Sequence, residues 1–181
     1  MQNTVRLLLV SILCFSGMNA QVQAQVALPA PDVKRPGALL ASDSPELYKS
    51  FFYTHDSLST FVEQKVAAEP SAKSRLDDGA AKTLRVNQED LSKISVVSRK
   101  VVADLKKIDV DERAHLNQRA KLDLGGDPAL MKTFAHRRLA AVSDGMDNLN
   151  KTLPPDSWTG LRKFINERHR QDLRVVEVGR K

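Results

Sequence analysis

The chain has 181 residues, of which 41% are hydrophobic and 28% charged, and this balance is typical of an ordinary globular protein with one domain. Its formal net charge of +6 favours weak attraction to anionic surfaces but indicates no specific ligand. The only cysteine, Cys14, lies in the N-terminal apolar run. If that run is removed, disulfides, thiol nucleophiles, iron–sulfur clusters and covalently attached c-type haem are excluded.

The N-terminus has the three zones of a cleaved signal peptide. Arg6 precedes an apolar run over residues 7–15, and small residues suited to cleavage follow at Ala20 and Ala24. The run is too short to span about 30 Å of hydrocarbon, which argues against an uncleaved membrane anchor. The residues before Cys14 also differ from a lipoprotein signal. We therefore predict a secreted or periplasmic protein, cleaved after Ala20 or Ala24, whose net charge falls by one with the loss of Arg6.

Residues 25–44 are rich in proline and show no helical period, which predicts an extended linker or arm. Ser44 and Pro45 predict the start of a helix, because serine caps a helix and proline fits its first position. We expect this helix to end near Ala68. Its apolar stripe carries four aromatic rings and is expected in the core: Leu47, Tyr48, Phe51, Phe52, Leu58, Phe61, Val62 and Val66.

The clearest helix signal in the chain follows Asn87. A cluster of turn-forming residues over 69–79 and a short helical piece at 80–85 are expected before it. Asn87 is a typical N-cap, and Asp90 can return a hydrogen bond to it. The buried face of the central helix is then predicted to contain Leu91, Ile94, Val97, Ser98, Val101, Val102, Leu105 and Ile108.

The end of this central helix has two possible positions. Asp109 and Glu112 form a second cap-like pair, so the helix could break near Asp109, but we favour continuation to about Leu122 with a local bend. The sequence Gly125-Gly126-Asp127-Pro128 then ends one helix and starts the next.

The next helix has apolar residues in steps of three and four. They predict a second buried seam made of Met131, Ala135, Leu139, Val142, Met146, Leu149 and Leu153. Gly145 interrupts the seam and indicates either a close helix approach or a slight bend. Pro154 and Pro155 end the helix, and Trp158 and Leu161 belong to a final one.

No pair of strands is evident, so we predict an all-α fold, an up-and-down bundle of about four helices with an extended N-terminal arm. The predicted organisation is a signal peptide, a proline-rich arm, a helical bundle domain and a basic tail, at residues 1–24, 25–44, 45–170 and 171–181.

One motif could bind a metal. Glu112 and His115 have the Glu-x-x-His spacing of di-iron bundles, in which both side chains share one helical face. Such a site needs a second pair and two further glutamates, and His136 has Thr133 and Lys132 where a carboxylate should be. We therefore interpret the pair as part of an exposed helix face and predict no cofactor. A metal or haem carrier centred on His115 is the alternative.

A group of cations near the C-terminus is the other candidate site. Aromatic residues are not interleaved with these cations, so a nucleic-acid partner is not expected. The candidate anion-binding residues are Arg137, Arg138, Arg162, Lys163, Arg168, Arg170 and Arg174.

Catalytic signatures such as Gly-x-Ser-x-Gly and the phosphate-binding loop are absent from the sequence. We therefore predict a non-catalytic helical protein of the cell envelope, an interaction, chaperone-like or structural module whose partner is another envelope protein. The alternative is a binder of an anionic envelope polymer or membrane surface through the C-terminal basic face. In size, export signal and charge the chain is similar to small periplasmic stress chaperones of the helical cradle type, but it lacks their repeated Leu-Thr-x-x-Gln motif.

Overall fold

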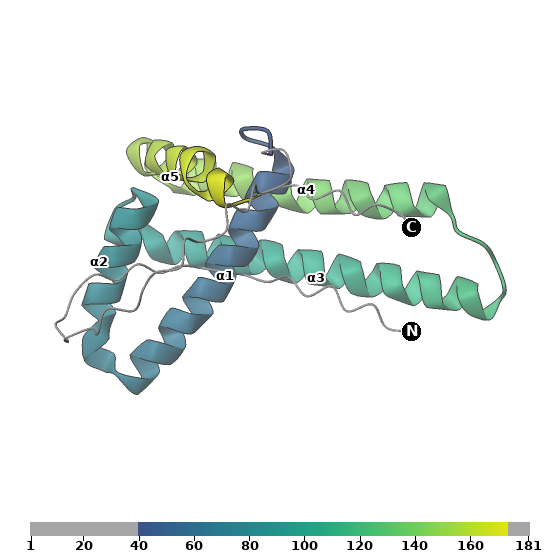
Figure 1. Ribbon diagram of the computed structural model, residues 1–181, viewed down its shortest axis with the longest axis horizontal. Helices are drawn as coiled ribbons and strands as arrows, with labels where there is room; N and C mark the ends of the chain where they lie inside the picture. Colours follow the sequence, from purple (N-terminus) through teal and green to yellow (C-terminus); the bar gives the residue numbers. More distant parts are fainter. Residues whose placement is uncertain (1–39, 174–181) are drawn as a thin grey trace, which may run out of the picture. The chain divides into compact units, whose positions relative to one another are not determined.

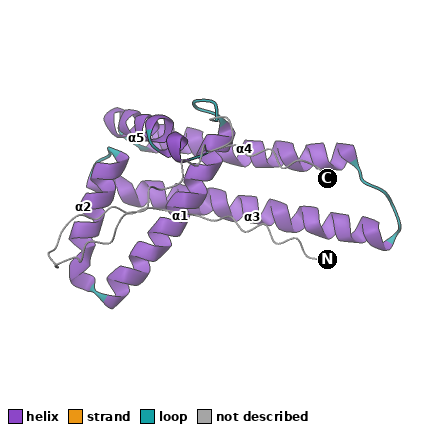
Figure 2. Cartoon of the chain, in the orientation of Figure 1, coloured by secondary structure: helices purple, strands orange, loops and turns teal. Residues whose placement is uncertain are grey.

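The computed structural model describes residues 40–173, which belong to one unit of the chain. They contain five α-helices and three short 3-10 helices, and no strand, which confirms the all-α prediction for this part of the chain (Figure 2). The predicted signal peptide, most of the arm and Arg174 lie outside the described residues. The elements are α1 (Pro45–Ala68), η1 (Pro70–Ala72), α2 (Lys73–Leu84), η2 (Gln88–Asp90), α3 (Leu91–Lys121), α4 (Pro128–Thr152), α5 (Pro155–Glu167) and η3 (His169–Asp172).

Two predicted helix starts are confirmed in atomic detail. The Ser44 hydroxyl accepts a hydrogen bond from the Leu47 N–H at 3.3 Å, and the Asp127 carboxylate accepts one from the Leu130 N–H at 3.0 Å. Each cap satisfies an N–H group that has no partner within its own helix. The central helix, α3, is continuous over 31 residues, so the predicted continuation past Asp109 is also confirmed.

The turn predicted over residues 69–79 is shorter in the structure. Only η1 interrupts the chain, and α2 already begins at Lys73, so Asp77 and Gly79 are helical. The side chains of Lys73 and Asp77 form an ion pair one turn apart, which supports the helix start. Gly79 lowers the stability of α2 by about 1 kcal/mol relative to alanine, but the helix continues through it to Leu84. The described residues therefore contain five α-helices, close to the predicted bundle of about four, and the short helical piece expected at 80–85 is the end of a longer helix that begins at Lys73.

Asn87 stands at the N-cap of η2, as predicted, but its side chain makes no capping bond. The backbone N–H of Asn87 donates instead to the Ser157 hydroxyl of α5 at 3.3 Å. That hydroxyl donates to the Asp90 carboxylate at 2.7 Å, and Lys93 lies 2.5 Å from the other carboxylate oxygen. Asp90 is fully buried. Burial raises the pKa of Asp90, but the hydrogen bonds from Lys93 and Ser157 outweigh it and hold the pKa below its usual value.

The first part of α3 and the N-terminal half of α1 supply most of the core. The predicted buried face of α3 is confirmed from Ile94 to Ile108, and the α1 residues from Leu47 to Phe52 face it. The C-terminal half of α1 does not continue this packing, because Leu58 and Phe61 are exposed. There α1 contacts α3 through polar groups instead, such as the hydroxyls of Ser59 and Ser95, 3.0 Å apart, so that part of the predicted stripe was wrong.

The predicted seam of α4 is only half correct. Val142, Leu149 and Leu153 are buried, Met146 is half-buried, and Met131, Ala135 and Leu139 are exposed. In the first part of α4 the inward positions belong to Phe134, which is buried, and to Arg138. Arg138 lies against α3, where it pairs with the carboxylates of Asp109 and Glu112.

Gly145 marks a close helix approach, one of the two alternatives that the sequence left open. A Cβ atom at residue 145 would lie 2.4 Å from the Val101 side chain and 3.1 Å from the Phe52 ring. Three helices, α1, α3 and α4, therefore meet at this glycine. Gly160 has a similar role, because a Cβ there would lie 2.0 Å from the Arg85 carbonyl oxygen at the end of α2.

The helices α3 and α4 lie side by side and run in opposite directions, joined by the loop at residues 122–127 (Figure 1). The other helices pack on the first part of α3 and the last part of α4. Beyond Ile108, the last buried residue of α3, α4 is the one helix of the described residues that lies beside α3 (Figure 1). The α3–α4 hairpin thus extends past the core.

The buried face of α3 gives a stability prediction. We expect Leu105→Ala to lower the free energy of unfolding by about 2–5 kcal/mol, because the truncated side chain leaves a cavity in the core. Val96→Ala is the matched control, since Val96 is 69% exposed on the same helix, and it should change stability by less than about 0.5 kcal/mol. Urea denaturation followed by circular dichroism measures both values. Equal stabilities of the two variants would contradict the assignment of this face.

Candidate interaction surface

Two C-terminal cations, Arg162 of α5 and Arg170 of η3, bind the chain's own residues 40–43. Arg162 holds the Asp43 carboxylate with two hydrogen bonds of 2.9 and 2.6 Å, and Arg170 donates to the Leu40 carbonyl. Lys163 lies 3.9 Å from Glu167. The hydrogen bond from Arg162 lowers the pKa of Asp43 to about 2, although burial opposes this shift. Arg162 and Arg170 therefore hold the segment before α1 in place.

Two cations of α4 are paired with carboxylates of α3. Arg138 binds Asp109 at 2.7 Å and also binds Glu112, while Arg137 binds Asp111 at 2.7 Å. The Arg137 guanidinium also lies 5.3 Å from the centre of the Phe134 ring, within the range of a cation–π contact. These pairs tie α4 to α3.

The structure thus divides the predicted anion-binding residues between two places. Arg137 and Arg138 lie on α4, whereas Arg162, Lys163, Arg168 and Arg170 lie on α5 and η3. Arg168 is exposed at the end of α5. Nearby oxygen atoms of the chain offset most of these charges, so an external anion would compete with an internal one.

Glu112 and His115 do not join a set of metal ligands. Glu112 is bound by Arg138, and the exposed His115 lies against Phe134, with 5.7 Å between the ring centres. Within residues 40–173, no three His, Cys, Asp or Glu side chains are grouped closely enough to hold a metal ion.

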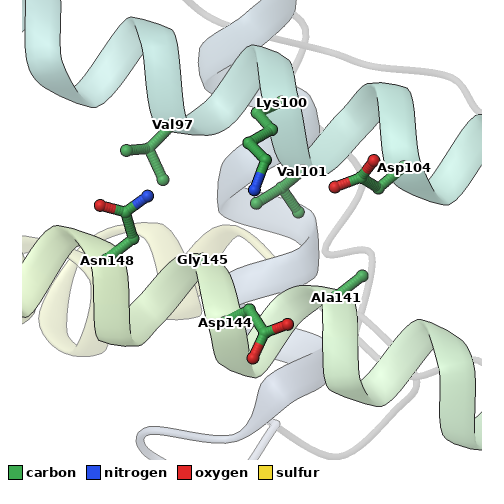
Figure 3. Close-up of a pocket in the computed structure, with 8 residues that line it drawn as sticks. All are labelled: Val97, Lys100, Val101, Asp104, Ala141, Asp144, Gly145 and Asn148. Carbon is green, nitrogen blue, oxygen red and sulfur yellow. The ribbon is translucent and has the colours of Figure 1, made fainter.

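A small hollow lies between α3 and α4 beside Gly145 (Figure 3). Its volume is about 30 Å³, which is enough for a water molecule and far below the several hundred Å³ of a metabolite site. Figure 3 shows that its polar side chains come from both helices. The lining residues are Val97, Lys100, Val101, Asp104, Ala141, Asp144, Gly145 and Asn148.

Exposed apolar side chains gather where the α3–α4 hairpin extends past the core. We call residues 113–132 the hairpin end. Leu122 and Leu124 are 62% and 50% exposed in its loop, and Leu116 and Met131 are exposed on the adjoining turns of α3 and α4. The sequence analysis placed Met131 in a buried seam and singled out neither loop leucine. The sequence Leu122-Asp123-Leu124, directly before the two glycines that end the helix, could have indicated exposed leucines in a turn.

The loop of the hairpin end is held in place by Arg119. Its guanidinium donates to the Gly125 carbonyl at 3.1 and 2.9 Å and lies 3.4 Å from the Asp127 carboxylate. Asp127 also caps α4. The same side chains therefore fix the loop and start the next helix, so Leu122 and Leu124 are presented on a fixed backbone.

Two buried histidines lie against the ring of Phe51. The ring centre of His55 in α1 is 5.6 Å from that of Phe51, and the ring centre of His169 in η3 is 6.0 Å from it. The His55 Nδ1 lies 3.3 Å from the Ser59 hydroxyl, whereas the His169 Nε2 has no hydrogen-bond partner among the described residues. Burial lowers the pKa of His55 to about 4 and also lowers that of His169, against the opposing charge of Asp172.

Comparison with known proteins finds no matching family model, no similar curated protein and no similar solved structure. Within residues 40–173, no helix has both the length and the apolar character needed to cross a bilayer.

The buried histidines predict that the protein loses stability in mild acid. Because their pKa values are lower in the folded chain than in the unfolded chain, the unfolded state binds more protons below about pH 6.5. For one histidine the free energy of unfolding should fall by about 1.4 kcal/mol per pH unit between pH 6.5 and its folded pKa. Urea denaturation at pH 7.5, 6 and 5 measures this slope.

Substitution of each histidine separates the contributions. His55→Gln and His169→Gln should each make the dependence on pH less steep, whatever their effect at pH 7.5. His136→Gln is the control, because His136 is exposed on α4, and it should leave the slope unchanged. A slope that neither buried histidine alters would show that other groups cause the acid sensitivity.

Proposed function

We propose that this chain is an exported, non-catalytic interaction protein of the cell envelope, and that the hairpin end is its contact surface. The observation that carries the proposal is the group of exposed apolar side chains at Leu116, Leu122, Leu124 and Met131, beyond the part of α3 that other helices cover. Clustered exposed apolar side chains are typical of sites that bind a protein or a membrane.

The contacts of Arg119 support this assignment. A loop that is already held by hydrogen bonds loses little conformational freedom when a partner binds it, and this improves affinity. The ion pairs of Arg138 with Asp109 and Glu112 have a similar effect, since they join α3 and α4 just before the hairpin end. In this proposal the helical core acts as a support for the contact surface.

The remaining parts of the chain fit the same proposal. Residues 1–24 act as a cleaved signal peptide, and residues 25–44 form an arm that precedes the helical domain at 45–170. The last residues of this arm, 40–43, are bound by Arg162 and Arg170. This use of the two cations favours the hairpin end over the C-terminal basic face as the place where an external partner binds.

A site-specific cross-linker tests the contact surface. A photoreactive residue in place of Leu124 should cross-link to a component of the envelope when the protein is exported in its own cells. The same residue in place of Val96, which is exposed on α3 outside the hairpin end, is the matched control and should give at least about tenfold less product. Equal yields of cross-linked product from residues 124 and 96 would show that the hairpin end is not the contact surface.

Export itself has a direct test. Mass spectrometry of the protein from the periplasm or the culture medium should give a chain that begins after Ala20 or Ala24, because the N-terminal zones are those of a cleaved signal peptide. An Arg6→Glu variant should be exported less efficiently, since the positive charge before the apolar run is reversed. Recovery of the exported chain with Met1 intact would contradict cleavage.

A further inference from the structure

The loop of the hairpin end carries its two most exposed apolar side chains two positions apart in the sequence. Leu122 follows the last residue of α3, and Leu124 precedes Gly125, so both belong to the turn between the helices. The Asp123 between them has a positive φ of 53°, and the Leu124 N–H donates to the Arg119 carbonyl at 3.0 Å. The hairpin therefore ends in a fixed apolar turn.

Cations without an ion pair lie on both helices that adjoin this turn. Arg119 is paired with Asp127, which leaves Lys121 and Lys132 next to the loop, and Arg113 about two turns earlier in α3, without an ion pair in the part of the chain described, against the single carboxylate of Asp123. Lys121 ends α3, and Lys132 lies in the first turns of α4, so one exposed lysine lies on each side of the loop. The charges without an ion pair therefore make the hairpin end positive. Arg162 on α5, by contrast, is neutralised by its pair with Asp43.

The four exposed apolar side chains of the hairpin end form a small surface, and this limits the kind of partner that it can bind. A stable protein–protein interface usually buries roughly 800 Å² on each partner. Four partly exposed side chains at the end of a hairpin offer well under that area. A bilayer surface needs less, because a few apolar side chains can enter the boundary between head groups and acyl chains while cations bind lipid phosphates.

We propose that the hairpin end binds the surface of an anionic phospholipid membrane. Leu122 and Leu124 enter the head-group boundary, and Lys121 and Lys132 contact lipid phosphates on either side of the loop. Arg119 keeps the loop in the conformation that presents both leucines. This inference rests on the proposed function, since it names the partner of the same surface.

Vesicle sedimentation tests the partner. The exported chain should bind vesicles that contain phosphatidylglycerol at least about tenfold more tightly than vesicles of phosphatidylcholine alone, and more weakly as salt rises, because salt screens the lysine–phosphate attraction. Leu122→Ser and Leu124→Ser should each lower the affinity by about tenfold. Lys121→Gln and Lys132→Gln should each lower it by about fivefold.

Matched controls separate binding by the hairpin end from nonspecific binding through any exposed apolar or positively charged side chain. Val96→Ser removes an exposed apolar residue of α3 outside the hairpin end, and Lys106→Gln with Lys107→Gln removes two exposed cations from the middle of α3. These controls should bind the vesicles like the unchanged chain. All variants should keep the helical circular dichroism signal and the thermal midpoint, because the replaced side chains are exposed.

The outcomes distinguish this inference from the proposed function. No binding to phosphatidylglycerol vesicles at low salt, or equal losses in the hairpin and control variants, would overturn the membrane inference. If the cross-linker at Leu124 then captures a protein or a second copy of the chain, the hairpin end remains the contact surface and only its partner was wrong. If the vesicles are not bound and the cross-linker at residue 124 also gives no more product than the one at residue 96, both the membrane inference and the proposed contact surface are wrong.

Discussion

The arrangement of the helices depends on the contact at Gly145. Val101 of α3 and Phe52 of α1 occupy the space that a side chain at this position would need, so three helices converge only because residue 145 has none. This convergence gathers the aromatic half of α1 onto the first part of α3. The remainder of α3 and the beginning of α4 have no third helix to cover them, and the exposure of the hairpin end follows from where the three helices meet.

The excess of positive charge is a poor guide to where the protein would bind an anion. Arg138 and Arg162 are strong cations, but carboxylates bind both within the fold. Burial and hydrogen bonding around Asp43 and Asp90 show the same pattern, since each carboxylate has more than one donor. Pairing thus links distant parts of the chain, and Lys121 and Lys132 at the hairpin end are among the cations of the described residues that have no ion pair.

Local features of the fold could be predicted from the sequence, and contacts between distant residues could not. The caps at Ser44 and Asp127 and the buried face of α3 depend on residues within a few positions, so their patterns identify them. The N-terminus of α3 instead depends on Ser157, 67 residues from Asp90, which no local pattern reveals. Met131 and Phe134 both fit a helical period, and the face of α4 that turns towards α3 buries Phe134 and leaves Met131 exposed, which the local pattern does not reveal. The exposure of Leu122 and Leu124 likewise depends on where the other helices pack along α3 and α4, which is a property of the tertiary structure.

The contacts of Asp43 join the beginning of the helical domain to its end. Its carboxylate is bound by Arg162 and Asn166 of α5, its N–H donates to Asn166, and the neighbouring Leu40 carbonyl is bound by Arg170 of η3. These contacts close the ends of the helical domain onto each other, because residues 40–43 are held against α5 and η3. None of them reaches the loop that carries Leu122 and Leu124, so the two ends of the domain are joined at a place separate from the exposed hairpin loop.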